Sequence, residues 1–359
     1  MNQSINQSIN QSINQSINQS INQSRIYWLD LVRAIAIVLV VFTHVHEQSG
    51  IGSNIIKSIF YDIDRLGVAL FFMLSGSFIL PKVVNVDIFS FYKKRIPQFV
   101  ILIFIYAFAT TLAYKLSIGK SFTDSARESF IWHNGIYPAN YGSAIQLWFM
   151  YSIIGLYLVA PFLAKLLDRL TNKEIIIFLC VSVLVTQFKS TLMDGFGIKF
   201  DILNRTGTEM VGGYLNFFVL GYFLLHRNIR LGLLSSILLF LIPIIVSLMV
   251  EVYKNAFIKS LHWYSTSLQI LLSGIGLLSL IRIFFENKPR NKYIESISIY
   301  SFGIYLSHYI FIYLLKSSID FSNMNLVVKL IILFIPTFVC SYIFTWFLYK
   351  FKYTRFLVI

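Results

Sequence analysis

Apolar runs of about 20 residues recur along most of the chain, and they limit its possible folds more than any other feature. Of the 359 residues, 57% are hydrophobic and 13% are charged, and the mean hydropathy is +0.70. Soluble domains carry about 25% charged residues. Within a bilayer only helices and closed barrels satisfy every backbone polar group, and runs of this length are typical of helices. The sequence therefore predicts an all-α polytopic membrane protein.

The apolar runs fall in one domain, which we place at residues 25–359. Its Lys and Arg residues lie mainly in the short loops between the runs. Boundaries read from sequence are uncertain by several residues. We expect about ten transmembrane helices, at 26–46, 64–82, 96–114, 144–164, 174–191, 211–226, 231–251, 261–285, 296–316 and 326–349.

Residues 1–24 differ from everything that follows. NQSI is repeated five times from residue 2 and is followed by NQS. The segment is polar, uncharged and of low complexity, so we expect it to be disordered. It lacks the basic start and apolar core of a signal peptide. The tetranucleotide CAAT, read in triplets, encodes Gln-Ser-Ile-Asn, so the repeat is consistent with slipping DNA and phase variation. A linker duplicated in twelve-base units is the alternative.

The net charge of +14 does not indicate nucleic-acid binding, because the cations flank membrane segments. The shorter, more cationic loops fall on the side of the N-terminus, which predicts that both termini are cytoplasmic. The two cysteines, Cys180 and Cys340, stand alone in apolar runs. No metal-ligand spacing or nucleotide-binding motif is present, so we expect neither a metal nor nucleotide hydrolysis.

The segment Trp28–Glu47 carries charges that a membrane helix normally excludes: Asp30, Arg33 and His44. Intramembrane ionisable groups are costly and usually functional. Arg33 and His44 are eleven residues apart, which places them on one helix face about 16 Å apart along the axis. Asp30 can pair with Arg33 three residues later. We interpret this stripe as a cation near the inner face and an imidazole near the outer face.

Each residue of this stripe has a structural alternative. Arg33 could be an internal strut paired with Asp30, and His44 could be an interfacial histidine. If it is catalytic, His44 could act as a general base or carry an acyl group covalently. His46 points to another face, whereas Glu47 could orient an imidazole.

Further candidates lie elsewhere in the chain. Arg65 could bind an acceptor or developing negative charge, or anchor its helix at the interface. His308 is a second intramembrane imidazole that could line a pore or fill a packing site. Two outer loops, about 115–143 and 192–210, carry possible acceptor contacts. These are the aromatic side chains Trp132, His133, Tyr137 and Tyr141, and the charged ones Asp194, Lys199, Asp201, Arg205 and Glu209.

An ordered set of motifs resembles the acyltransferase family 3 integral membrane proteins, which O-acylate bacterial surface glycans. The set begins with D-x-x-R-x10-H at Asp30, Arg33 and His44. It continues through RLGVALFFMLSGSFIL (65–80), FYKKRIPQF (91–99), LWFMYSIIGLYLVAPFL (147–163), GGYLNFFVLGYFLLHR (212–227) and SFGIYLSHYIFIYLL (301–315). The resemblance covers nearly everything from residue 26 onward.

The resemblance implies a two-sided reaction at the bacterial inner membrane. Acyl-CoA, most simply acetyl-CoA, is the cytoplasmic co-substrate, no cofactor is bound, and the acceptor is a surface glycan such as lipopolysaccharide or capsule. The implied catalytic residues are His44, Arg33 and Asp30, and the donor phosphates would meet Lys93, Lys94 and Arg95. The acceptor or pore residues would be Arg65, Gln146, Trp148 and His308.

Gln146 departs from the pattern, because many family members have His before LWF. This departure weakens a catalytic role for the position, although an amide can still hydrogen-bond an acceptor. The competing function is a glycan-lipid transporter or flippase. Transporters often have repeated halves, and this sequence has no clear internal repeat after residue 25.

Overall fold

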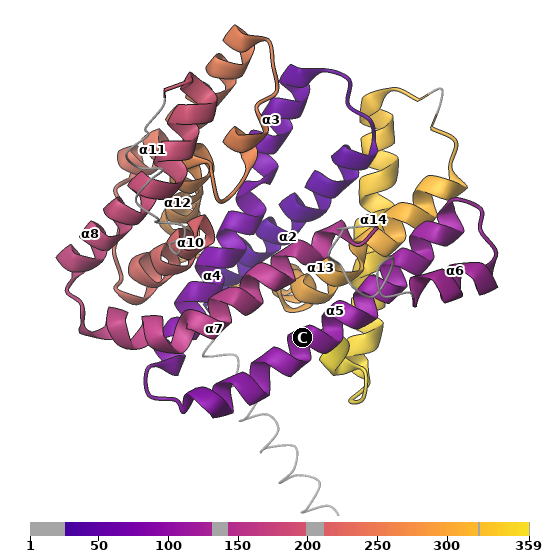
Figure 1. The fold of residues 1–359 in the computed structure, drawn as a ribbon, viewed down its shortest axis with the longest axis horizontal. Coiled ribbons are helices and arrows are strands. Elements are labelled where there is room, and N and C mark those ends of the chain that lie inside the picture. Colours follow the sequence, from indigo (N-terminus) through magenta and orange to yellow (C-terminus); the bar gives the residue numbers. More distant parts are fainter. Residues whose placement is uncertain (1–25, 131–142, 199–211, 322–323, 359) are drawn as a thin grey trace, which may run out of the picture.

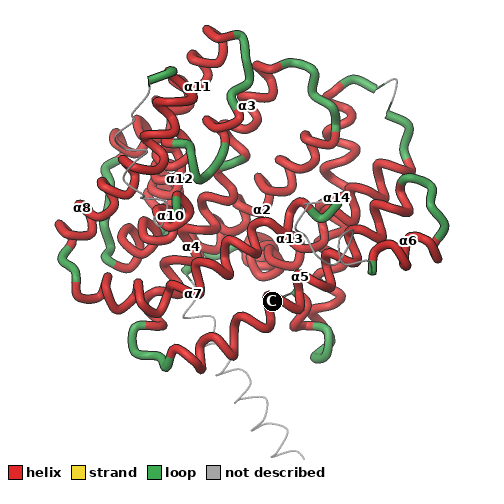
Figure 2. The backbone as a smooth tube through the Cα atoms, in the orientation of Figure 1, coloured by secondary structure: helices red, strands yellow, loops and turns green. Residues whose placement is uncertain are grey.

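The computed structural model describes residues 26–130, 143–198, 212–321 and 324–358, and every regular element within them is helical (Figure 2). The NQSI repeat lies outside these residues. So do the loop aromatic residues Trp132, His133, Tyr137 and Tyr141, and the loop residues Lys199, Asp201, Arg205 and Glu209. The prediction of an all-α membrane protein is confirmed.

Nine helical spans among the described residues are long and apolar enough to cross a membrane, and Gly213–His226 is a shorter apolar helix. Together they occupy all ten predicted segments. The long helices are α2 (Tyr27–Gln48), α4 (Leu66–Val83), α5 (Ile88–Ser117), α7 (Trp148–Arg169), α11 (Leu233–Lys254), α12 (Leu268–Phe285), α13 (Lys292–Ser318) and α14 (Leu326–Lys350).

Several spans are extended or interrupted by shorter pieces. Helix α3 precedes α4 with a one-residue break at Arg65, and α8 and α10 continue into π-helical turns. The shorter elements are α3 (Asn54–Asp64), α6 (Phe122–Ser129), η3 (Ile145–Leu147), α8 (Asn172–Val183), η4 (Leu184–Phe188), η5 (Thr191–Gly195), α10 (Gly213–Gly221), η7 (Tyr222–His226), η8 (Lys259–His262) and η9 (Arg355–Leu357).

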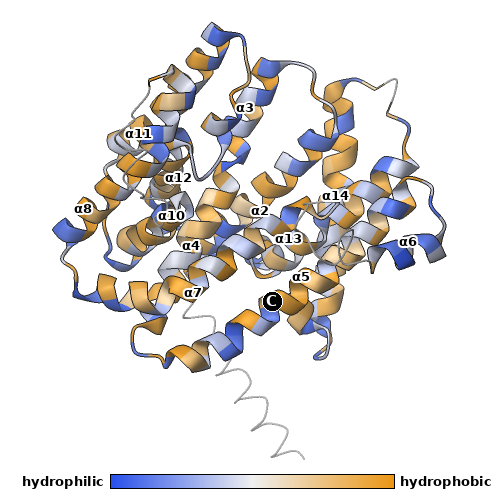
Figure 3. Cartoon of the chain, viewed as in Figure 1, coloured by the Kyte–Doolittle hydropathy of each residue, from blue (hydrophilic) through white to orange (hydrophobic). Residues whose placement is uncertain are grey.

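Helix α2 forms the centre of the bundle (Figure 1). It packs against α4 and α13. Of its most apolar 18-residue stretch, 72% is buried inside the protein, whereas only 11% of the corresponding stretch of α11 is buried. Helices α11 and α14 leave many large apolar side chains exposed, and hydrophilic residues gather at helix ends and in connections (Figure 3). This distribution is typical of a bundle solvated by lipid. The charged stripe of α2 therefore lies in the protein interior and not at its lipid surface.

Two glycines bring α4 and α10 into backbone contact. A Cβ atom added at Gly76 would lie 1.8 Å from the carbonyl oxygen of Phe218, and one at Gly221 would lie 1.8 Å from that of Met73. Small residues at helix interfaces let membrane helices approach closely. By contrast, a Cβ atom at Gly155 on α7 would meet no atom of the described residues within 4 Å.

These two environments predict opposite responses to the same substitution. Gly221→Ala must push α4 and α10 apart, and overpacking of this kind typically costs about 1–3 kcal/mol or more. Gly155→Ala should be tolerated, because its methyl group enters open space. We expect Gly221→Ala to lower the melting temperature in detergent by several degrees while Gly155→Ala leaves it unchanged. Equal melting temperatures for the two variants would contradict the close α4–α10 contact.

Candidate active site

His44 lies near the end of α2 with its ring buried. Its Nδ1 atom is 2.8 Å from Oε2 of Glu47, one helical turn later, and 3.2 Å from the hydroxyl of Tyr309 on α13. A carboxylate at Nδ1 holds the proton on that nitrogen and leaves Nε2 as the basic position. Nε2 has no hydrogen-bond partner among the described residues. His44 is therefore oriented as a general base or nucleophile.

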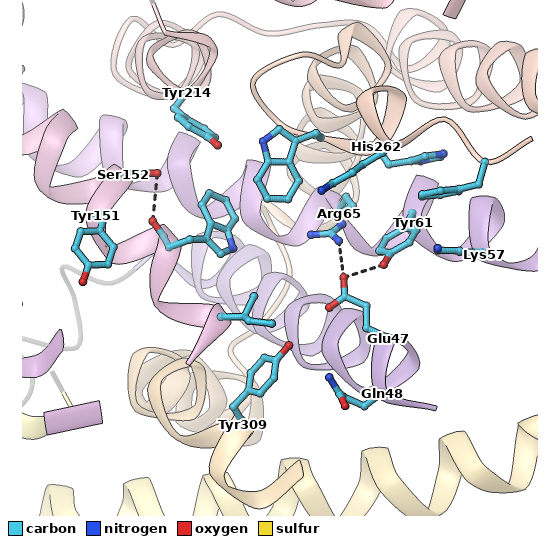
Figure 4. Close-up of a pocket in the computed structure, with 15 residues that line it drawn as sticks. Glu47, Gln48, Lys57, Tyr61, Arg65, Tyr151, Ser152, Tyr214, His262 and Tyr309 are labelled. Atoms are coloured by element: carbon cyan, nitrogen blue, oxygen red, sulfur yellow. Dashed lines mark hydrogen bonds and ion pairs between the residues drawn. The ribbon is translucent and has the colours of Figure 1, made fainter. Parts of the chain in front are cut away.

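Glu47 links the imidazole to a cation from the next helix pair. Its Oε1 atom accepts hydrogen bonds from the Tyr61 hydroxyl at 2.8 Å and from Nη2 of Arg65 at 2.6 Å (Figure 4). Arg65 is itself buried, with its guanidinium 4.5 Å from the Tyr61 ring centroid and 3.4 Å from the Tyr264 hydroxyl. A buried carboxylate is stabilised only when it is paired in this way. The expected role of Glu47 in orienting an imidazole agrees with this geometry.

A cavity of about 770 Å³ opens beside this pair, and Glu47, Arg65 and Tyr309 line it (Figure 4). Much of its wall is aromatic: the Trp148 ring lies 5.2 Å from that of Trp263, and the buried Tyr264 ring stacks on Trp148 at 5.3 Å. A cavity with aromatic walls and a few fixed polar groups suits a ligand ring that has apolar faces and polar groups at its edge. The remaining lining residues are Gln48, Lys57, Tyr61, Ile145, Tyr151, Ser152, Tyr214, Phe257, Lys259 and His262.

At the other end of α2, Arg33 lines two further cavities of about 280 and 640 Å³. Arg95 lines both of them and Lys82 lines the larger one. Lys93 and Lys94, the neighbours of Arg95, are exposed on α5 and line neither cavity. The structure thus brings together the two arginines of the predicted cationic set. Guanidinium groups bind phosphates through paired hydrogen bonds.

Asp30 is buried at this end and its Oδ1 atom accepts a hydrogen bond of 2.6 Å from Ser298. This contact fixes α2 against α13. The sequence prediction assigned Asp30 to Arg33 as an ion-pair partner, and that pairing stays a prediction.

His308 and Gln146 lie between the two ends. The His308 ring is 5.3 Å from that of His44 and 6.2 Å from that of Tyr305, which lines the smaller cavity near Arg33. Tyr305 donates a hydrogen bond of 2.6 Å to the Gln146 carbonyl, and the Gln146 amide donates to Thr110 at 3.1 Å. Nε2 of His308 and Oε1 of Gln146 are buried without hydrogen-bond partners in the described part of the chain. A belt of neutral polar groups thus separates the two charged regions.

The chain matches the family model of the family 3 acyltransferase domain over residues 26–346. The chain belongs to acyltransferase family 3. No curated protein and no solved structure gave a match. The match covers most of the chain, including all the site residues named above, and it shows that this multi-pass membrane protein is an acyltransferase.

Two histidine–carboxylate clusters escaped the sequence analysis. His46 lies 2.6 Å from Asp64, with both side chains buried, which explains why it turns away from His44. His262, beside the aromatic cavity, lies 3.2 Å from Asp62 and 2.9 Å from Glu251. The short sequence DID at 62–64 was an available signal, because two carboxylates so close to a membrane segment need partners.

The His262 cluster holds the cavity wall. It ties η8 to α3 through Asp62 and to α11 through Glu251. Burial lowers the pKa of His262, but the two carboxylates outweigh burial and raise it above its ordinary value. Both ring nitrogens face carboxylates, so the imidazolium form is the one that satisfies the cluster.

A raised pKa makes this cluster a source of pH-dependent stability. His262 stabilises the fold fully below the unfolded-state pKa of about 6.5, and this contribution is lost as pH rises through the higher folded-state pKa. We expect the melting temperature difference between wild type and His262→Gln to shrink by roughly 2 °C or more from about pH 6 to about pH 9. The exposed His226, replaced in His226→Gln, is the matched control. A difference independent of pH would show that His262 is uncharged in the folded protein.

Proposed function

We propose that this acyltransferase moves an acetyl group from cytoplasmic acetyl-CoA to a hydroxyl of a cell-surface glycan such as lipopolysaccharide or capsule. The observation that carries the proposal is the position of His44. The His44–Glu47 pair stands between an arginine-lined region at one end of α2 and an aromatic cavity at the other. A transfer between two sides of a membrane requires separate sites that meet at one catalytic group.

The donor would bind at the Arg33 end. Arg33 and Arg95 would contact the phosphates of CoA, and the pantetheine arm would extend past Tyr305 and His308 toward His44. In this orientation both termini are cytoplasmic and the protein resides in the inner membrane. The aromatic cavity would then face outward and receive the sugar, with Trp148 and Arg65 in its wall.

In the transfer step, Nε2 of His44 takes the proton of the acceptor hydroxyl as its oxygen attacks the thioester carbonyl carbon. The carbon–sulfur bond breaks, and the CoA thiolate receives the proton back from the imidazolium. Glu47 stabilises that imidazolium through Nδ1. The Tyr309 hydroxyl, 3.2 Å from the same Nδ1 atom, helps to hold the imidazole in place. Transfer through an acetylated His44 is the second route, in which Nε2 itself attacks the thioester.

His44→Ala tests the central step. Removing a general base typically costs about 10²–10⁴-fold in rate, and we expect this loss in acetyl transfer per unit of inserted protein. Glu47→Gln should also reduce transfer, because the amide cannot stabilise an imidazolium. The assay follows labelled acetyl-CoA into extracted glycan, with His226→Gln as the control. Wild-type transfer by His44→Ala would rule out His44 as the catalytic group. Label on His44 in the absence of glycan would identify the covalent route.

The donor site predicts that replacing the half-buried cation Arg33 reduces activity more than replacing an exposed cation. Arg33→Lys keeps the positive charge but loses the planar guanidinium group, which can donate two parallel hydrogen bonds to a phosphate. Hydrogen bonds to charged groups contribute about 1.5–3 kcal/mol, so we expect kcat/KM for acetyl-CoA to fall about 10- to 100-fold. Lys93→Gln, at an exposed position on α5, should have a smaller effect. Equal losses in the two variants would indicate general attraction of CoA to the surface and not a site at Arg33.

The NQSI repeat would add control of expression. If its codons follow the tetranucleotide CAAT, gain or loss of one unit shifts the reading frame and switches the enzyme off. We expect repeat number to vary between colonies, with acetylated glycan in only some of them. Sequencing the gene alongside mass spectrometry of the glycan measures both. Synonymous codons that break the four-base period would contradict this mode of control.

A further inference from the structure

The aromatic cavity continues into an apolar groove of about 510 Å³ between α7 and the start of α10. Ser152 and Tyr214 line both spaces, so they form the junction between them. The groove shares no lining residue with the two cavities at Arg33. Its occupant therefore belongs to the acceptor side of the reaction and not to the donor side.

The groove follows one face of α7 from Ser152 to Leu166. At 1.5 Å per residue, these 14 steps span about 21 Å, which exceeds the ~15 Å of one leaflet of a ~30 Å hydrocarbon core. Phe162 and Leu166 in its wall are 60% and 50% exposed, so the groove opens sideways toward lipid. A long hydrocarbon chain fits this shape, and a free sugar does not.

Gly155 makes room for that chain. Elsewhere in the bundle, Gly76 and Gly221 are places where another helix presses against the backbone. At Gly155 an added Cβ atom would meet none of the described residues within 4 Å, although the residue lies inside a membrane helix. The missing side chain thus leaves space in the groove instead of serving a helix contact.

Two lysines line the aromatic cavity. Lys259 Nζ is 5.8 Å from the ring centroid of Trp263, which packs on Trp148. Lys57 Nζ lies 4.3 Å from the Phe257 ring centroid in the same cavity wall. Ammonium groups in the wall of this cavity suit a ligand that carries a phosphate between its sugar and its lipid.

We propose that this groove binds the hydrocarbon chain of a phosphate-linked lipid-glycan, whose sugar enters the aromatic cavity for acylation. The inference rests on the proposed function and specifies its acceptor. The enzyme acts on glycan that is still attached to its membrane carrier. The groove aligns the carrier with α7, and the shared residues Ser152 and Tyr214 mark where lipid ends and sugar begins.

Gly155→Leu tests the groove, because its side chain fills open space and should leave the fold intact. The control is Leu158→Phe, on the same helix and 44% exposed, but outside the groove. Both variants and wild type, purified in detergent, receive labelled acetyl-CoA and one of two acceptors. One acceptor is the lipid-linked glycan extracted from membranes of the producing cells. The other is the same glycan released from its lipid by mild acid.

We expect Gly155→Leu to raise KM for the lipid-linked acceptor about tenfold, equivalent to losing roughly two buried methylene contacts. It should leave KM for the released glycan unchanged, and Leu158→Phe should change neither. Equal use of both acceptors by wild type, or equal effects of Gly155→Leu on both, would overturn the groove and show that bilayer lipid only fills it. Wild-type enzyme that acetylates neither acceptor would overturn the proposed function, and this inference with it.

Discussion

The half-buried carboxylate of Glu47 forms the contacts on which the site depends. It contacts the His44 imidazole through one oxygen and the Arg65 guanidinium and Tyr61 hydroxyl through the other. Partial removal of this carboxylate from water is costly, and its partners offset that cost only in a fixed geometry. The same contacts fix α2 against the α3–α4 junction. The geometry of the candidate site and the packing of these helices therefore depend on one group.

The α3–α4 junction carries an unusual density of charge, and each group has a partner on a different element. Asp62 faces His262 of η8, Asp64 faces His46 of α2, and Arg65 faces Glu47 of α2. Because each charge has a partner, Asp62, Asp64 and Arg65 can all stay buried within a stretch of four residues. The pairs also position the aromatic wall, because Trp263 and Tyr264 directly follow His262.

Much of the fold could be predicted from the sequence, since the bilayer admits few solutions for apolar runs of this length. All ten predicted segments are helical, and the stripe of Arg33 and His44 lies on the central helix. Glu47 could be anticipated because it is only three residues from His44. Local spacing on one helix carries this information.

Contacts between distant segments could not be predicted. Arg65 reaches Tyr264 across 199 residues, and Glu251 reaches His262 between a helix and a following loop. Nothing in single-sequence periodicity reports which helices are neighbours. The apolar groove was invisible for the same reason, because Gly155 and Gly76 look alike in sequence and differ only in what packs against them.

If transfer runs from one side of the membrane to the other, as proposed, the neutral belt between the two charged regions would be the part that the acyl group crosses. Tyr305, Gln146 and His308 offer hydrogen bonds between these regions. A thioester and an acetyl group are neutral and small, so such a belt can accommodate them. The phosphates of a CoA donor are charged, and in the proposed function Arg33 and Arg95, which line one cavity, would be their partners before the belt. Moving those phosphates past the arginines would exchange paired charges for uncompensated ones in a low-dielectric interior. The same arrangement that admits the acyl group would therefore hold the nucleotide portion back.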